Sequence, residues 1–150
     1  MAHSYTNLLV HIVFGTKNRE PRLQKPILER VLPFIASGIK DHGGIPLELN
    51  GVADHVHILA KVRQDRALSD LLRDIKACSS GWIHKNIPEL QSFAWQAGYG
   101  AFSIGQSQIE AVRRYIQNQE EHHRTQTFQE EYIGFLELAG IEYDLRYLWD

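Results

Sequence analysis

Two histidines flank a single valine in the stretch ADHVHIL, residues 53–59. In a strand, successive side chains point to opposite faces, so His55 and His57 share one face while Val56 lies on the other. The pair indicates either two structural histidines or a metal or phosphate site. Two imidazoles on one face offer two of the ligands that a divalent ion needs, which favours the second interpretation.

Other known histidine chemistries need residues that the sequence lacks. A histidine-triad nucleotide hydrolase would place a third alternating histidine at position 59, which is leucine. A two-histidine phosphoesterase needs two separate His-x-Ser/Thr motifs, and a zincin needs His-Glu-x-x-His; the sequence contains neither set. Since Cys78 is the only cysteine, an internal disulfide and a cysteine-based zinc site are also excluded.

The second group of interest is YIQNQ, residues 115–119. On a helix, residues i and i+4 lie on the same face, so Tyr115 and Gln119 point the same way. Tyr115 is either an ordinary core or interface aromatic or a nucleophile, and a phenol with a pKa of about 10 needs activation. A metal held by His55, His57 and the Gln119 carbonyl would polarise a phosphodiester for attack by this phenol. The strand would then supply two metal ligands, and the helix would supply the third ligand and the attacking oxygen.

The elements that must position these residues follow from hydrophobic periodicity and turn residues. Strands are expected over 5–14, 45–52 and 55–62 and at the end of 93–104. Helices are expected over 23–44, 68–86, 107–123 and 127–140. Pro33 conflicts with the first helix. Ser69 and Ser107 are expected as N-caps, Ser107 in a capping box with Glu110.

This order of elements predicts an α+β fold. Its first six elements match a ferredoxin-like split β-α-β pattern, with an antiparallel sheet and helices on one face. The histidine strand is then central, and the other face of the sheet is free for a site. The C-terminal helices carry the candidate nucleophile.

Length and composition are those of one soluble globular domain, residues 1–150, with 43% hydrophobic and 23% charged residues. The apolar runs are too short to span a bilayer, and the first residues do not resemble a signal peptide, so a cytoplasmic protein without a membrane partner is expected. The net charge is −2, with +3 over residues 1–100 and −5 over residues 101–150. Contact with nucleic acid would therefore need a local basic face.

Several cations are candidates for that face, although each is equally compatible with a solvated surface position: Lys17, Arg19, Arg73, Lys76, Arg113 and Arg114. His122 lies two helical turns after Tyr115, where it could support the metal site, contact a phosphate or act as a helix-end cation. His11 is expected to be structural. The role of Asp54 is open.

The sequence resembles the single-tyrosine HUH transposases of the insertion-sequence-200 type, which include transposases associated with repetitive extragenic palindromes. HVH matches the HUH motif, and YIQNQ matches the tyrosine motif. Further stretches match in order along nearly the whole chain: HIVFGTKNR, WQAGYGAFSIGQS, VRRYIQNQEEHH, TFQEEY and YDLRYLWD.

The resemblance implies a transposase, a metal-dependent endonuclease and strand transferase. Tyr115 would attack single-stranded DNA that carries hairpin ends, leaving a 5′-phosphotyrosine and a free 3′-hydroxyl. His55, His57 and Gln119 would hold Mg²⁺ or Mn²⁺. Family members form homodimers in which the tyrosine helix of one protomer can complete the other's metal site. The predicted strand 5–14, being long and apolar, is a candidate for the dimer interface.

Two rival interpretations remain open. One is a ferredoxin-like module that binds single-stranded nucleic acid without cutting it. The other is a domesticated or inactive relative that acts as a regulator. Tyr115 together with Gln119 favours the enzyme, because a passive binding module needs neither residue.

Overall fold

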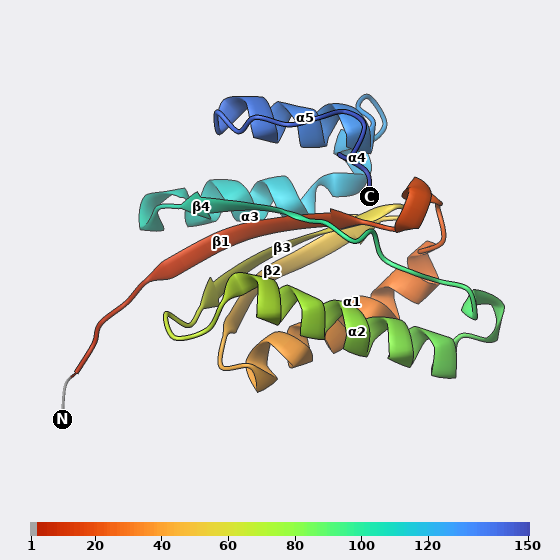
Figure 1. The fold of residues 1–150 in the computed structure, drawn as a ribbon, viewed down its shortest axis with the longest axis horizontal. Coiled ribbons are helices and arrows are strands. Elements are labelled where there is room, and N and C mark those ends of the chain that lie inside the picture. The colour runs from red at the N-terminus through yellow and green to blue at the C-terminus, as the bar shows by residue number, and fades with distance from the viewer. Residues whose placement is uncertain (1–2) are drawn as a thin grey trace.

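A four-stranded antiparallel sheet lies at the centre of the computed structural model, which describes residues 3–150 (Figure 1). Its strands are β1 (Leu8–Gly15), β2 (Ile45–Val52), β3 (His55–Val62) and β4 (Gly100–Ile104). They lie in the order β2-β3-β1-β4, with β1 and β3 in the middle. This is the strand order of the split β-α-β pattern, so the predicted α+β fold is confirmed.

Helices cover both faces of the sheet (Figure 1). On one face lie α1 (Lys25–Asp41) and α2 (Leu68–Asn86), and on the other lie α3 (Ile109–Gln117), α4 (Gln119–His122) and α5 (Phe128–Leu138). Short 3₁₀ turns η1 (Lys17–Arg19), η2 (Pro88–Leu90) and η3 (Gln106–Gln108) join the larger elements. The face that was expected to be free for a site is therefore roofed by the chain's own C-terminal helices.

The alternation of side chains along β3 separates the main core from the other face. Val56, Ile58 and Ala60 are buried in the core that the sheet forms with α1 and α2. The α1 side of this core is a stripe at helical spacing, formed by Leu28, Val31, Ile35 and Ile39. His55 and His57 point to the opposite face because they alternate with this apolar set.

Some local predictions about the helices were wrong. The expected helix 107–123 is divided into η3, α3 and α4, with a break at Asn118 (φ −98°, ψ 25°). The N-cap of α2 is Ala67 rather than Ser69, and Ser107 forms no capping box; instead, the Gly105 N–H donates to Gln108 Oε1 over 2.7 Å. Pro33 lies within α1 without ending it.

Strand β1 is paired along both of its edges. It pairs with β3 over Leu8–Gly15 and with β4 over Leu9–Val13. The expectation that strand one forms the dimer interface is therefore wrong, since its ladder positions are already used inside the chain. The outer strands of the sheet are β2 and β4. Among residues 3–150, no helix has the length and apolar character needed to cross a membrane.

The packing of α1 on the sheet gives a direct test of this core. Ile35 is 1% exposed, whereas Ile45 at the start of β2 is 52% exposed. We expect Ile35→Ala to lower the free energy of unfolding by about 2–5 kcal/mol, because it leaves a cavity. Ile45→Ala should cost less than about 1 kcal/mol. Urea unfolding measures both, and equal losses would contradict the assignment of the core.

Candidate active site

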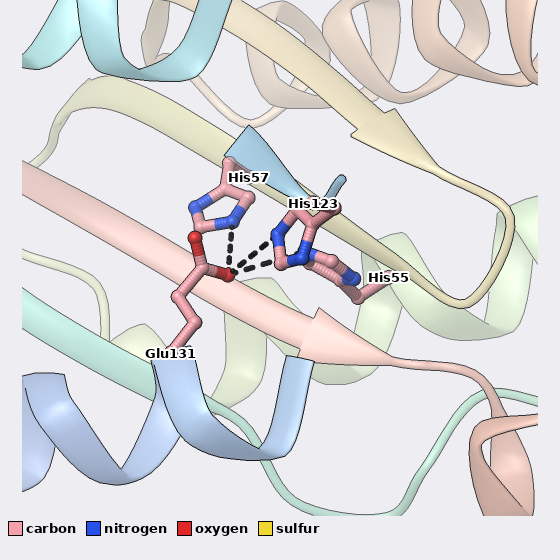
Figure 2. A group of neighbouring side chains, drawn as sticks. All are labelled: His55, His57, His123 and Glu131. Carbon is pink, nitrogen blue, oxygen red and sulfur yellow. Dashed lines mark hydrogen bonds and ion pairs between the residues drawn. The ribbon is translucent and has the colours of Figure 1, made fainter. Parts of the chain in front are cut away.

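The imidazole Nε2 atoms of three histidines converge on one carboxylate oxygen (Figure 2). His55 and His57 of β3 are fully buried, and their Nε2 atoms lie 3.2 and 3.0 Å from Glu131 Oε1. His123, directly after α4, places its Nε2 3.2 Å from the same oxygen. Residues far apart in the sequence thus form one cluster between the sheet and α5.

The second ring nitrogen, Nδ1, of each HUH histidine has a side-chain partner on the side away from Glu131. His55 Nδ1 lies 2.7 Å from Asp54 Oδ1, and His57 Nδ1 lies 2.8 Å from His11 Nε2. His11 on β1 reaches His57 diagonally, because its own partner in the ladder is Leu59. Partners of this kind fix the ring orientation of metal-binding histidines and direct Nε2 toward the ion. His11 and Asp54 therefore orient the two rings.

Burial and hydrogen bonding oppose each other in this cluster. Burial lowers the pKa of His57 to about 4 and that of His11 to about 3. Burial also opposes protonation of His55, but the hydrogen bond with Asp54 and the nearby carboxylate of Glu131 outweigh it and raise the pKa of His55. Burial alone would raise the pKa of Glu131, yet its hydrogen bonds with the histidines hold that pKa far below its usual range.

The Tyr115 phenol meets the other oxygen of the same carboxylate. It donates a hydrogen bond to Glu131 Oε2, and its oxygen lies 3.1 Å from His122 Nε2. Burial, followed by the bond to Glu131, raises the pKa of the phenol above its ordinary value. Three roles were considered for His122 from the sequence. The structure places its ring beside the Tyr115 hydroxyl, close to the cluster.

Asn50 links the histidine strand to the tyrosine helix. It pairs with His57 across the β2–β3 ladder, and its Nδ2 donates to the carbonyls of Ile116 (2.9 Å) and Gln117 (3.2 Å). These are carbonyls at the C-terminal end of α3, which have no partner within a helix. Asn50 therefore fixes the end of α3, one and two residues beyond Tyr115, against the sheet.

Gln119 lies beside the cluster rather than at its centre. It is fully buried, with its Oε1 3.0 Å from His123 Nε2 and its Nε2 3.2 Å from the Tyr115 carbonyl. The other nitrogen of His123, Nδ1, lies 2.7 Å from the Gln126 carbonyl. His123 therefore connects Gln119 to the site that the HUH histidines form.

The donor set fits a divalent cation. Ligand atoms of His55, His57, His123 and Glu131 all lie within 4.8 Å of one another. The His55 Nε2 atom is buried and has no hydrogen-bond partner in residues 3–150, although it points at Glu131 Oε1. A buried polar atom without a partner is costly, and a bound ion would satisfy it.

Four residues that the sequence predicted for the site lie in this cluster or beside it, and two members of the cluster were not predicted. The structure brings His55, His57 and Tyr115 together and places Gln119 next to them. It adds His123 and Glu131. The signal for His123 was its spacing of four residues from Gln119. The signal for Glu131 was a carboxylate in a predicted helix between the aromatic residues Phe128 and Tyr132. In the structure the Glu131 side chain is buried, with 3% of the residue exposed.

The predicted cations do not share one environment. Lys17 and Arg114 are exposed, and Arg113 is half-buried. Arg19 lies over the Trp149 ring at 5.2 Å. Arg73 is paired with Asp70 and Asp74. The Lys76 ammonium donates to the carbonyls of residues 96, 97 and 98. Lys76 and Arg73 thus already have partners within the chain, and the DNA contacts stay predictions.

Comparison with known proteins identifies the family. The model described as "Transposase IS200 like" matches residues 4–119, more than half of the chain. The chain belongs to the IS200-like transposase family. The match includes the HUH histidines, Tyr115 and Gln119, whereas His123 and Glu131 lie beyond the matched residues. The search of curated proteins gave no match.

Solved structures support the fold of this IS200-like transposase. One is a candidate transposase from Deinococcus radiodurans R1, with 18% identity and a TM-score of 0.65, over 79% of this chain and 96% of the other. Another is a REP-associated tyrosine transposase bound to a REP hairpin, with 16% identity and a TM-score of 0.61, over 82% of this chain and 73% of the other. At these identities the similarity shows the fold alone.

The link through Asn50 gives a testable consequence. Asn50→Ala leaves two carbonyls of α3 without their donor, so we expect a loss of about 1–3 kcal/mol in stability and faster amide hydrogen exchange in α3. Asn86→Ala removes a similar bond to the Trp82 carbonyl at the exposed end of α2 and serves as the control. Unchanged exchange in α3 would show that Asn50 does not hold the tyrosine helix.

Proposed function

We propose that this transposase cuts and rejoins single-stranded DNA through Tyr115, with a divalent ion at the HUH histidines. The observation that carries the proposal is that one carboxylate, Glu131, touches both parts of the site. Its Oε1 meets the Nε2 atoms of the histidines, and its Oε2 accepts the Tyr115 hydroxyl. The contacts support a proposed nucleophile and a proposed ion site that are adjacent within one chain.

The donor set favours Mn²⁺ over Mg²⁺. Mg²⁺ prefers oxygen ligands and keeps several waters, whereas imidazole suits later transition metals better. His55 and His57 would hold the ion, with Gln119 near it through His123. When bound, the ion supplies a positive charge that polarises the scissile phosphate and offsets the negative charge that develops on it.

The tyrosine side chain would carry the covalent step. The Tyr115 oxygen forms a bond to phosphorus while the bond from phosphorus to the 3′-oxygen breaks. The phenol proton passes to one of its two hydrogen-bond partners, Glu131 or His122, and the departing 3′-oxygen takes up a proton to become a hydroxyl. Attack by the 3′-hydroxyl of another strand reverses these steps and releases the tyrosine, so rejoining needs no external energy source.

The partner expected for this site is single-stranded DNA with hairpin ends. The REP-associated relative was solved bound to a REP hairpin, which supports a DNA hairpin as the partner here. The contact between Tyr115 and Glu131 in one chain favours a site assembled in cis. A homodimer with exchanged tyrosine helices stays a prediction, as do the single-domain organisation and a cytoplasmic location.

A covalent-adduct assay tests the proposed chemistry. The protein is incubated with Mn²⁺ and single-stranded DNA from the flanks of its own gene, then analysed on a denaturing gel. We expect a denaturation-resistant adduct that Tyr115→Phe abolishes, because the variant lacks the nucleophilic oxygen. Tyr143→Phe, which loses a hydroxyl that bonds Glu137, is the matched control and should form the adduct normally.

An adduct that persists in Tyr115→Phe would contradict the assigned nucleophile. No adduct from the wild-type protein, with the DNA still bound, would favour a single-stranded nucleic-acid-binding module or an inactive relative instead.

Removal of metal should separate binding from cleavage. We expect EDTA to abolish the adduct and excess Mn²⁺ to restore it, because the phosphate is not polarised without the ion. Binding of the DNA, followed by fluorescence anisotropy, should change less than the adduct yield. A full yield of adduct in EDTA would show that the reaction does not use the ion.

A further inference from the structure

Glu131 reaches the histidine cluster and the nucleophile at the same time. Its carboxylate projects from α5 toward β3 (Figure 2). Oε1 lies 3.0–3.2 Å from the Nε2 atoms of His55, His57 and His123. Oε2 accepts the Tyr115 hydroxyl. Among residues 3–150, this is the carboxylate that the four-member His/Glu group contains.

A carboxylate in this position is not explained by packing. Glu131 is 3% exposed, and its helix neighbours Phe128 and Tyr132 are equally buried. Burying a charge is costly unless opposite charges or donors surround it. An apolar side chain of similar size would fill the space at lower cost. The chain thus buries a carboxylate among the two HUH rings, His123 and the phenol.

The ring nitrogens that point away from Glu131 have oxygen partners of their own. The Nδ1 atoms of His55 and His123 lie 2.7 Å from oxygens of Asp54 and Gln126. An imidazole that donates through Nδ1 can offer its Nε2 lone pair to a cation. The Nε2 atoms that face Glu131 Oε1 are therefore the ones available for coordination.

The distances agree with a shared ion. Atoms bonded to one ion at about 2.1 Å lie about 3.0–3.5 Å apart when their bonds meet at about 90–110°. The three separations between Glu131 Oε1 and the imidazole nitrogens, 3.0, 3.2 and 3.2 Å, lie in this range. The four ligand atoms all lie within 4.8 Å of one another, so a bound ion would draw the imidazole nitrogens closer together.

We propose that Glu131 is a ligand of the ion through Oε1 and holds the Tyr115 hydroxyl through Oε2, so that one carboxylate fixes the nucleophile at the metal. The ion is then held by three imidazoles and a carboxylate, with His123 as the third imidazole. The inference rests on the proposed function in taking the ion and Tyr115 as parts of one site. It adds two residues that lie beyond the segment matched by the family.

Metal affinity tests the ligand role without DNA or turnover. Titration calorimetry with Mn²⁺ compares the wild-type protein with Glu131→Gln, which keeps the shape but removes the charge. We expect at least a tenfold loss of affinity. Glu130→Gln is the matched control, because it is the adjacent, exposed residue of α5 and glutamine also suits its capping position; its affinity should stay within about twofold.

A Mn²⁺ affinity of Glu131→Gln that equals or exceeds the wild-type value would overturn the inference. If Glu131 only fills the place of the ion and must move away, removing its charge would leave Mn²⁺ affinity equal or higher. Circular dichroism establishes that the variants are folded. If Glu131→Gln does not fold, Glu131→Asp takes its place, since its shorter arm cannot reach both the ion and the phenol. Affinity equal to or above the wild-type value in that variant would overturn the inference as well.

A separate NMR measurement tests whether metal binding is coupled to the Tyr115 hydroxyl through Glu131. In protein labelled with ¹³Cζ-tyrosine, Tyr115→Phe identifies the Tyr115 NMR signal, and Zn²⁺ serves as a diamagnetic probe. We expect Zn²⁺ to shift this signal in the wild-type protein and not in Glu131→Gln at metal saturation. An equal shift in both would show that the coupling does not pass through Glu131.

These results are independent of the adduct assay. Metal binding that needs Glu131, in a wild-type protein that forms no adduct, would support the ligand role while the proposed function fails. Wild-type adduct formation together with unchanged metal affinity in Glu131→Gln would support the proposed function and overturn the inference.

Discussion

A buried negative charge must be met by donors or by a cation, and this constraint organises the site around Glu131. The carboxylate lies on the inner side of α5, within an otherwise aromatic and aliphatic face. Three imidazoles meet one of its oxygens and a phenol meets the other. Burial opposes protonation of His55, yet the carboxylates of Asp54 and Glu131 raise its pKa. A cation bound among these atoms would balance the same negative charge.

The sheet makes this arrangement possible because each of its faces has a separate task. Residues that alternate with the histidines along β3 form the main core with α1 and α2, so the core fixes the strand without using its other face. The HUH rings then point toward α3–α5, where His11 from the neighbouring strand orients His57. Asn50 on β2 anchors the end of the tyrosine helix. The histidine strand and its two neighbours thus each contribute to the alignment of the nucleophile with the metal donors.

Much of the fold and the grouping of four site residues could be predicted from the sequence, because both depend on local periodicity. The spacing of two residues places His55 and His57 on one face, and the spacing of four places Tyr115 with Gln119. Glu131 and His123 could not be predicted in the same way. Their roles depend on how α5 packs over the sheet, which is a contact between distant segments. The break at Asn118 was also missed, because Asn50 stabilises it from another strand. The prediction that strand β1 forms a dimer interface was wrong because a long apolar strand is expected both at an interface and at the centre of a sheet. The sequence does not distinguish these two positions.

Anomalous scattering from crystals grown with Mn²⁺ tests the central claim most directly, because it locates the ion without relying on activity. The account predicts one strong peak among the Nε2 atoms of His55, His57 and His123, with Glu131 bound to it and the Tyr115 oxygen hydrogen-bonded to the same carboxylate. A peak elsewhere, or no peak at the histidines in protein that binds Mn²⁺ in solution, would contradict it.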